Sequence, residues 1–131
     1  MADAYYKYGE LRTVEYTASG ADIDEDQIVV LGGVDAKKCS VGVAMKGVAD
    51  GSTVEGAIAV SGVFQFPKVS AAVITAGQSV NWDSSAGAVD DNAHTTAAGD
   101  VGEFGKAMAD GANGETTILV EISEPGTYDA A

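Results

Sequence analysis

The stretch Gly-Ala-Ile-Ala-Val-Ser-Gly-Val-Phe-Gln-Phe-Pro-Lys, residues 56–68, decides the fold of this chain. It carries no charge before Lys68, although acidic residues recur every few positions elsewhere in the sequence. Val60, Phe64 and Phe66 share one parity, which is close to the period of two that a β-strand requires. The pattern therefore predicts the central strand of a small all-β domain.

Two residues limit this predicted strand. Gly62 interrupts the apolar run, which indicates a bulge or a close approach of two backbones. Pro67 ends the run, because proline has no backbone N–H to donate to a ladder. We therefore expect an irregular strand rather than a flat one.

The rest of the chain contains further short alternating or β-branched runs separated by turn residues. They lie at residues 10–17, 27–31, 39–45, 79–83, 101–108 and 116–122. Residues 68–74 fit either a helical turn or an irregular loop, and the small polar residues of 84–100 fit a long exposed loop or loose hairpin. The sequence predicts one all-β domain of residues 10–122, a small barrel or sandwich with at most one short helix. An N-terminal arm of residues 1–9 precedes it and a C-terminal tail of residues 123–131 follows.

The chain also repeats part of itself at an offset of sixty residues. Residues 41–60 are identical to residues 101–120 at nine positions, and Ala49-Asp50-Gly51 falls on Ala109-Asp110-Gly111. Each copy has the pattern strand, turn, strand, and Asp-Gly is a strong hairpin signal. Two similar hairpins are expected, the alternative being a chance effect of a composition rich in Gly, Ala and Val.

The charge of the chain excludes some classes of function. A formal net charge of −13 at pH 7 argues against nucleic acid or an anionic membrane as a partner, because both require a basic surface. No signal peptide is expected at the start, and no apolar run approaches the roughly 20 residues of a membrane span. Cys39 is the only cysteine, so no disulfide framework is possible within the chain, which fits a reducing compartment.

Few residues point to catalysis or to a bound cofactor. His94 is the only histidine and lies in the least structured stretch, so a surface side chain is expected rather than part of a triad. Cys39 fits a small buried strand residue. The acidic run at residues 22–26 differs from a calcium loop, because Gln27 and Gly33 stand where glycine and a bidentate glutamate are needed. We expect no catalytic residue, no cofactor and no metal site.

Three tyrosines near the N-terminus are the candidate contact residues. Tyr5, Tyr6 and Tyr8 surround Lys7. Tyrosine is favoured at interfaces because it offers a large rigid apolar face and one polar tip. They fit two roles equally well, contact with a partner or cover for one end of the chain's own core.

Two ordered patterns resemble a known family. One is Gly62-Val63-Phe64 followed by Pro67-Lys68, and the other is Val80-Asn81-Trp82-Asp83. Together with the glycine spacing over residues 8–122, they resemble small phage and prophage proteins that act as capsid decoration, or cement, proteins. The family more often has tyrosine where this chain has Asn81. A recombinase-like label carried by some relatives has no support here, since there is no phosphate loop and no basic face.

The resemblance implies a fold and a function. The fold would be a small β-barrel or β-tulip-like sandwich, and the protein would form homotrimers on the outer surface of the expanded phage head. These trimers would bind the major capsid protein and stabilise contacts between capsomers, after synthesis in the bacterial host cytoplasm. Tyr5, Tyr6 and Tyr8 would be capsid-binding candidates. The alternative is an outward-displayed head domain that binds host surface or glycan through residues 84–100.

Overall fold

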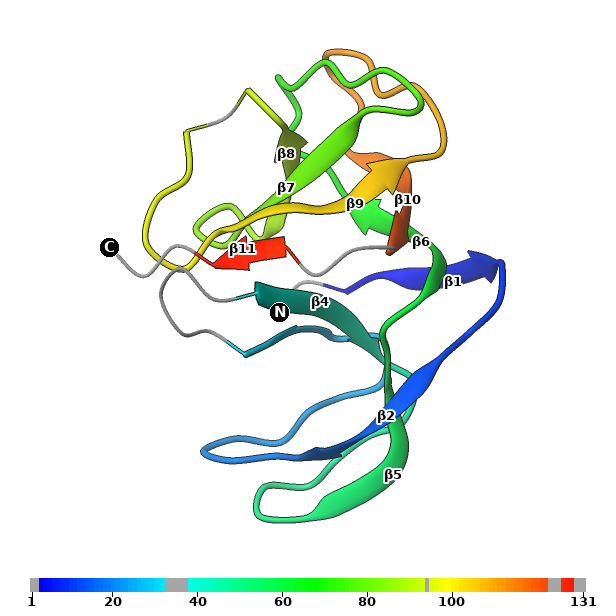
Figure 1. Cartoon of the computed structure of the whole chain (residues 1–131), viewed down its shortest axis with the longest axis vertical. Coiled ribbons are helices and arrows are strands. Elements are labelled where there is room, and N and C mark those ends of the chain that lie inside the picture. Colours follow the sequence, from blue (N-terminus) through cyan, green and yellow to red (C-terminus); the bar gives the residue numbers. More distant parts are fainter. Residues whose placement is uncertain (1–2, 33–37, 94, 123–125, 129–131) are drawn as a thin grey trace.

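A computed structural model of the chain describes residues 3–32, 38–93, 95–122 and 126–128, and the regular structure within these ranges is entirely β (Figure 1). The strands are β1 (Tyr5–Tyr8), β2 (Thr13–Thr17), β3 (Ile28–Leu31), β4 (Lys38–Ala44), β5 (Thr53–Ala59), β6 (Gly62–Pro67), β7 (Ser79–Asp83), β8 (Ala88–Asp91), β9 (Val101–Ala107), β10 (Thr117–Ile122) and β11 (Gly126–Tyr128). None of the described segments forms a helix with the length and apolar character of a membrane span. The predicted all-β class is confirmed.

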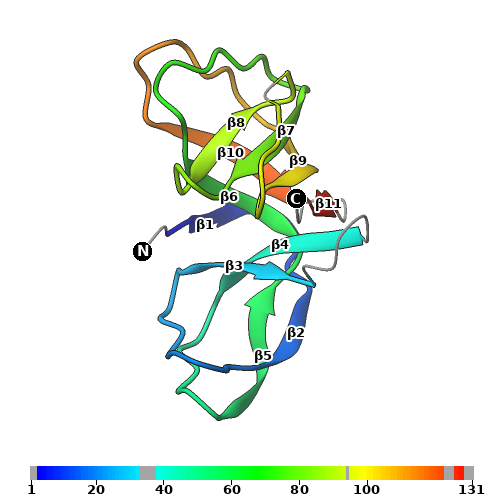
Figure 2. The ribbon, with the colours of Figure 1, turned by 90° about the vertical axis from the view of Figure 1, so that its left-hand side faces the viewer.

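The strands form two antiparallel sheets that lie one above the other along the long axis (Figures 1 and 2). The upper sheet has the order β1-β6-β10-β9-β7-β8, and the lower sheet has the order β2-β5-β4-β3. Strand β11 pairs with β4 on one side and β9 on the other, so it joins the sheets. The sheets do not close into a barrel, and of the predicted architectures the sandwich agrees with the arrangement.

The stretch at residues 56–68 is divided between the two sheets, so the prediction of one central strand is wrong in this detail. Strand β5 ends at Ala59 in the lower sheet and β6 begins at Gly62 in the upper sheet. Gly62 has a φ of +114°, and a Cβ there would lie 2.9 Å from Leu11 Cδ2. The chain therefore changes sheets at a position that requires glycine, as its interrupting place in the pattern indicates.

The core has two clusters, and the larger one, called the upper cluster, also takes in Val41, Val43 and Ala59 from the lower sheet. The upper cluster centres on aromatic rings, with Phe66 at 5.5 Å from Phe104 and 6.4 Å from both Phe64 and Trp82, measured between ring centroids. The lower cluster contains small and branched side chains: Ala18, Val29, Ala44, Val48, Ala57 and Ile58. Burial of a side chain such as Phe or Ile contributes about 1.5–3 kcal/mol, so most of the apolar stabilisation comes from the upper cluster.

Both repeated segments form hairpins, as predicted. Strand β4 pairs with β5 and β9 pairs with β10, both antiparallel. The structural offset, however, is larger than sixty. Ala44 pairs with Ile58 and Ala107 pairs with Val120, so the offset is 63 residues in the first strand and 62 in the second.

The turns of the two hairpins explain the change of offset. Val48 exchanges two 2.8 Å backbone hydrogen bonds with Ile23, and Gly111 exchanges two of the same length with Ile74. The turn after Val48 contains Asp50-Gly51, whereas the turn after Gly111 contains Asn113-Gly114. Expecting Asp-Gly to turn both hairpins is therefore wrong, because Asp110-Gly111 lies before the second turn.

The repeat extends beyond the hairpins to a second conserved turn geometry. Gln27 Oε1 accepts a hydrogen bond from the backbone N–H of Asp24 at 3.0 Å, and Gln78 Oε1 accepts one from that of Thr75 at 3.1 Å. Strands β3 and β7 follow these turns and pair with β4 and β9 in matching registers. Each sheet therefore contains the same four-strand unit, β2-β5-β4-β3 or β6-β10-β9-β7.

Two segments expected to lie outside regular structure are partly in strands, and a third forms a hairpin, which was one of its two expected forms. Within the predicted arm, Tyr5–Tyr8 pairs with β6. Within the predicted tail, Gly126–Tyr128 pairs with β4 and β9. Within residues 84–100, expected to form a long exposed loop or a loose hairpin, Ala88–Asp91 pairs with β7 as a hairpin. In each case the strand is held by backbone pairing to a distant or neighbouring segment, which leaves little trace in the residue pattern.

Candidate interaction surface

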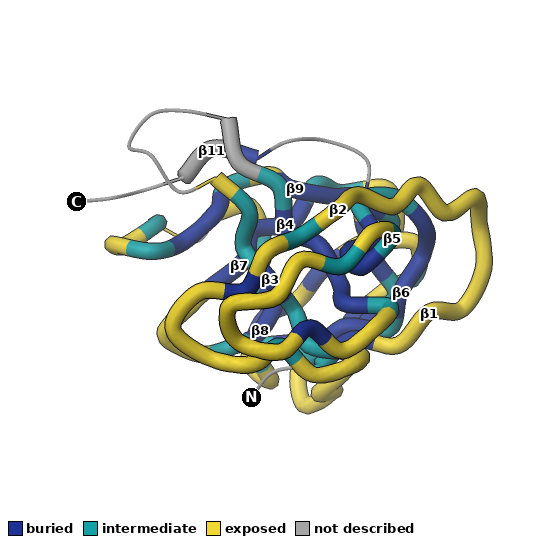
Figure 3. Tube along the Cα trace, turned by 90° about the horizontal axis from the view of Figure 1, so that it is seen from below, coloured by how far each residue is buried: buried dark blue, intermediate teal, exposed yellow. Residues whose placement is uncertain are grey.

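Among the described residues β1 pairs only with β6, so its tyrosines lie at an edge of the upper sheet. Tyr5 and Tyr8 are both 49% exposed and Tyr6 is 41% exposed, and Figure 3 shows the exposed trace along β1. The Tyr6 ring packs edge-on against Phe64, with centroids 5.6 Å apart, and its hydroxyl donates to the Gly9 carbonyl at 2.6 Å. Tyr6 thus covers part of the core while keeping an exposed face.

A cleft of about 610 Å³ lies beside β1. Its walls come from β1, β6, β10 and the loop before β10, through Lys7, Tyr8, Gln65, Ala109, Asp110, Glu115, Thr117, Ile118 and Leu119. An aromatic ring at the rim of a partly apolar depression is a common arrangement at protein–protein contacts. This tyrosine surface, defined as Tyr5, Tyr6, Tyr8 and the adjacent cleft, is the first candidate contact region.

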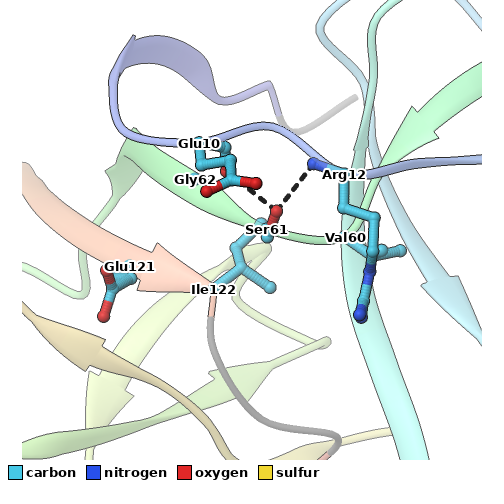
Figure 4. Close-up of a pocket in the computed structure, with 7 residues that line it drawn as sticks. All are labelled: Glu10, Arg12, Val60, Ser61, Gly62, Glu121 and Ile122. Atoms are coloured by element: carbon cyan, nitrogen blue, oxygen red, sulfur yellow. Dashed lines mark hydrogen bonds between the residues drawn. The ribbon is translucent and has the colours of Figure 1, made fainter.

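A second cleft, of about 390 Å³, lies where the chain changes sheets (Figure 4). Its lining contains Glu10, Arg12, Val60, Ser61, Gly62, Glu121 and Ile122. Ser61 holds its wall together, because its Oγ accepts from the Arg12 N–H at 2.7 Å and donates to the Glu10 carbonyl at 2.9 Å. The hydroxyl is thus engaged in the fold and is no candidate nucleophile.

The residues that carry the family resemblance lie inside the molecule rather than on a contact surface. Gly62, Val63 and Phe64 are buried on β6, and Trp82 and Asp83 are buried on β7. Asp83 Oδ1 accepts hydrogen bonds from Ser85 Oγ at 2.8 Å and from the Ala86 N–H at 3.1 Å. The motif thus determines packing and the turn after β7, while Pro67 and Lys68 end β6.

Lys68 is a buried cation. It was identified from the sequence only as part of the family motif, and its burial was not predicted. It is 4% exposed, and its ammonium donates to four backbone carbonyls, those of Val69, Ser70, Ala112 and Glu115, at 2.9–3.2 Å. Buried charge is costly unless it is fully hydrogen-bonded. The only available signal was a lysine that directly follows an apolar strand.

Asp100 is a second buried charged residue that sequence reasoning missed. It is 1% exposed, and its two carboxylate oxygens accept from the N–H groups of Ser84 and Ala97, each at 2.9 Å. These bonds tie both ends of the segment after β7 to one side chain. A single aspartate directly before a predicted strand was the one sequence feature that could have indicated this bridging role of Asp100.

The candidate catalytic and metal-binding residues do not assemble into a site within the described ranges. No group of three or more His, Cys, Asp or Glu side chains there has the spacing to hold a metal ion. The acidic run at residues 22–26 includes a turn, and Asp22 Oδ1 accepts from the Asp50 N–H at 2.7 Å. His94 and the side chain of Cys39 lie outside the described part of the chain.

The fold and these surfaces define a class of protein, a small acidic β-sandwich with exposed edge strands and shallow clefts that are suited to contacts with other macromolecules. A family model described as phage cement protein matches residues 9–122. The chain belongs to this family, and the predicted resemblance is confirmed. Membership makes it a structural protein associated with the exterior of a phage capsid. No curated protein and no solved structure matched the chain.

Proposed function

We propose that this chain is a decoration protein that binds the major capsid protein on the outside of the expanded phage head and stabilises contacts between capsomers. The observation that carries this proposal is the match to the cement protein family over residues 9–122. We further propose that it acts as a homotrimer and has no enzymatic role.

The physical properties of the chain support such a role. A charge of −13 keeps free copies soluble and mutually repelling. Binding to a lattice that presents many equivalent sites allows weak contacts to act together by avidity. Strand β11 connects the two sheets through its pairing with β4 and β9, so the domain offers one continuous set of strands for contact with neighbouring capsomers.

We assign the tyrosine surface to the capsid contact. Tyr5 and Tyr8 present about half of their surface to solvent, and Tyr8 borders the adjacent cleft. Burial of such rings against a partner brings large apolar area at low entropic cost, since tyrosine has few rotatable bonds. Lys7 adds a positive charge beside the cleft in a chain that is otherwise strongly acidic.

The experiment compares heads with and without the protein. Purified protein is mixed with immature and expanded shells of the cognate phage, and its copy number is measured by quantitative electrophoresis and cryo-electron microscopy. The proposal expects high occupancy with threefold symmetry on expanded shells only, and lower resistance to heat or chelator in heads that lack it. Heads that keep full physical stability but lose adsorption to host cells would instead support a host-binding domain.

A further inference from the structure

Strand β2 forms an open edge of the lower sheet. It is the last strand in the order β3-β4-β5-β2, and among the described residues only β5 pairs with it. Four of its five residues are exposed, and Figure 3 shows this edge on the surface. Open edges are sites for pairing with another chain, and proteins commonly cover or distort them.

The hydrogen bonds at both ends of β2 show which backbone groups face outward. Arg12 O accepts from the Val60 N–H at 2.8 Å, and the Ala18 N–H donates to Ser52 O at 3.1 Å. Even-numbered residues therefore face β5. Because strand residues alternate, the N–H and C=O groups of Thr13, Glu15 and Thr17 point away from the sheet.

The internal repeat shows how such an edge is used elsewhere in the same molecule. Strand β6 is the counterpart of β2, since Phe64 pairs with Val120 as Val14 pairs with Ile58. The outer edge of β6 carries β1, through the pairs Tyr6–Phe64 and Tyr5–Gln65. The four-strand unit therefore accepts a fifth, antiparallel strand at this position, with a register shift between Tyr6 and Tyr8.

We infer that the outer edge of β2 accepts an extended, basic segment of the capsid shell protein as an added strand. The inference rests on the proposed function, which supplies the shell as partner. Main-chain pairing would use the outward groups of Thr13, Glu15 and Thr17, as in recognition by strand addition. Val14, which is 37% exposed, would gain cover from the added strand.

The negative charge of Glu15 favours a basic segment over a second copy of this chain at the β2 edge. Antiparallel pairing of β2 with β2 of a second copy about its centre would place Glu15 opposite Glu15, between chains that each carry −13. Like charges directly opposite each other destabilise a sheet. A lysine or arginine opposite Glu15 reverses the sign of this interaction, so the edge favours a basic segment over another copy.

Hydrogen exchange on expanded shells tests the inference directly. The full chain is measured free and bound to shells of the cognate phage by mass spectrometry at single-amide resolution. We expect the amides of Thr13, Glu15 and Thr17 to exchange about tenfold more slowly when bound. Full occupancy with unchanged exchange at these three amides overturns the inference and leaves the proposed function intact. Failure of the wild type to bind any shell overturns both.

Three variants separate backbone pairing from charge. Glu15→Pro removes an outward N–H while leaving the bonds to β5, a position where edge strands tolerate proline, and it should weaken shell binding about tenfold. Glu15→Thr keeps the N–H and should weaken binding only about threefold. Glu55→Thr is the matched charge control on β5, which has neighbours on both sides, and should bind like wild type. Wild-type binding by Glu15→Pro, or equal losses for all three, contradicts strand addition. If Glu15→Pro does not fold, the exchange measurement on the wild type decides.

Discussion

The ammonium nitrogen of Lys68 lies 3.1 Å from the carbonyl oxygen of Ala112, a residue 44 positions later in the chain. Together with its bonds to Val69, Ser70 and Glu115, this contact attaches the end of β6 to the turn between β9 and β10. A Cβ at Gly111 would lie 2.9 Å from Lys68 Cε, so glycine leaves room for the lysine stem. The Pro-Lys pair of the family motif therefore ends a strand and also fixes a distant turn.

Lys68→Met should destabilise the protein by about 3 kcal/mol, because it removes charged hydrogen bonds and leaves buried carbonyls without a donor. Urea unfolding followed by circular dichroism measures the loss. Lys46→Met is the control, since Lys46 Nζ donates to Glu55 O at 3.1 Å on the exposed surface. A loss below about 1 kcal/mol for Lys68→Met would show that its carbonyl contacts contribute little net stability.

The repeat predicts that two glycines have the same role in the two sheets. A Cβ at Gly42 would lie 2.5 Å from Ile58 Cγ2, and one at Gly105 would lie 2.6 Å from Glu121 O. Gly42→Ala and Gly105→Ala should each cost about 1–3 kcal/mol through overpacking. Gly47→Ala is the control, because its Cβ would meet only Ile23 O, at 3.6 Å, and it should change stability by less than about 0.5 kcal/mol. Thermal unfolding that ranks Gly47→Ala with the other two contradicts the role of close strand contact.

Trp82→Ala should destabilise the fold by about 3–5 kcal/mol, since it deletes a large ring from the upper core. Trp82 is 5% exposed and packs edge-on against Phe66. Val73→Ala, at a side chain 61% exposed, is the control and should be nearly neutral. Chemical denaturation gives both values, and a loss below about 1 kcal/mol for Trp82→Ala would mean that the upper core repacks around the missing ring.

Much of the strand pattern was accessible from sequence because β-branched runs and turn residues are local signals. The predicted runs at residues 27–31, 79–83 and 116–122 agree with β3, β7 and β10 to within one residue at each end. Strands β1 and β11 were not predicted, since each is held by backbone pairing with segments far away in the chain. Local pattern carries no information on such pairing.

The internal repeat also shows that local sequence does not determine how strands pair. Ala49-Asp50-Gly51 and Ala109-Asp110-Gly111 are identical in sequence, yet only the first contains its hairpin's turn. Asp110 instead accepts a hydrogen bond from the Ala76 N–H through Oδ1, at 2.8 Å. The register of each hairpin is set by a bridge, from Val48 to Ile23 in the first and from Gly111 to Ile74 in the second. A comparison of short sequence segments does not reveal these bridges. The buried role of Lys68 was inaccessible for the same reason, because two of its partners lie more than forty residues away.

Variants of the tyrosine surface should separate the contribution of each ring to stability from its contribution to capsid binding. Deletion of residues 1–9, the predicted N-terminal arm, would remove β1 from β6 and uncover Phe64, so point variants are the sharper test. The double variant Tyr5→Ala, Tyr8→Ala should lower shell affinity at least thirtyfold, since truncation of interface anchors costs about 2 kcal/mol or more. Its stability should fall by less than about 1 kcal/mol, because both rings are half exposed. Tyr6→Ala is the matched comparison and should mainly lower stability, through loss of the Phe64 contact and of the 2.6 Å bond to Gly9 O. Unchanged occupancy of the double variant on expanded shells would remove β1 from the capsid contact and leave the edge of β2 as the remaining candidate.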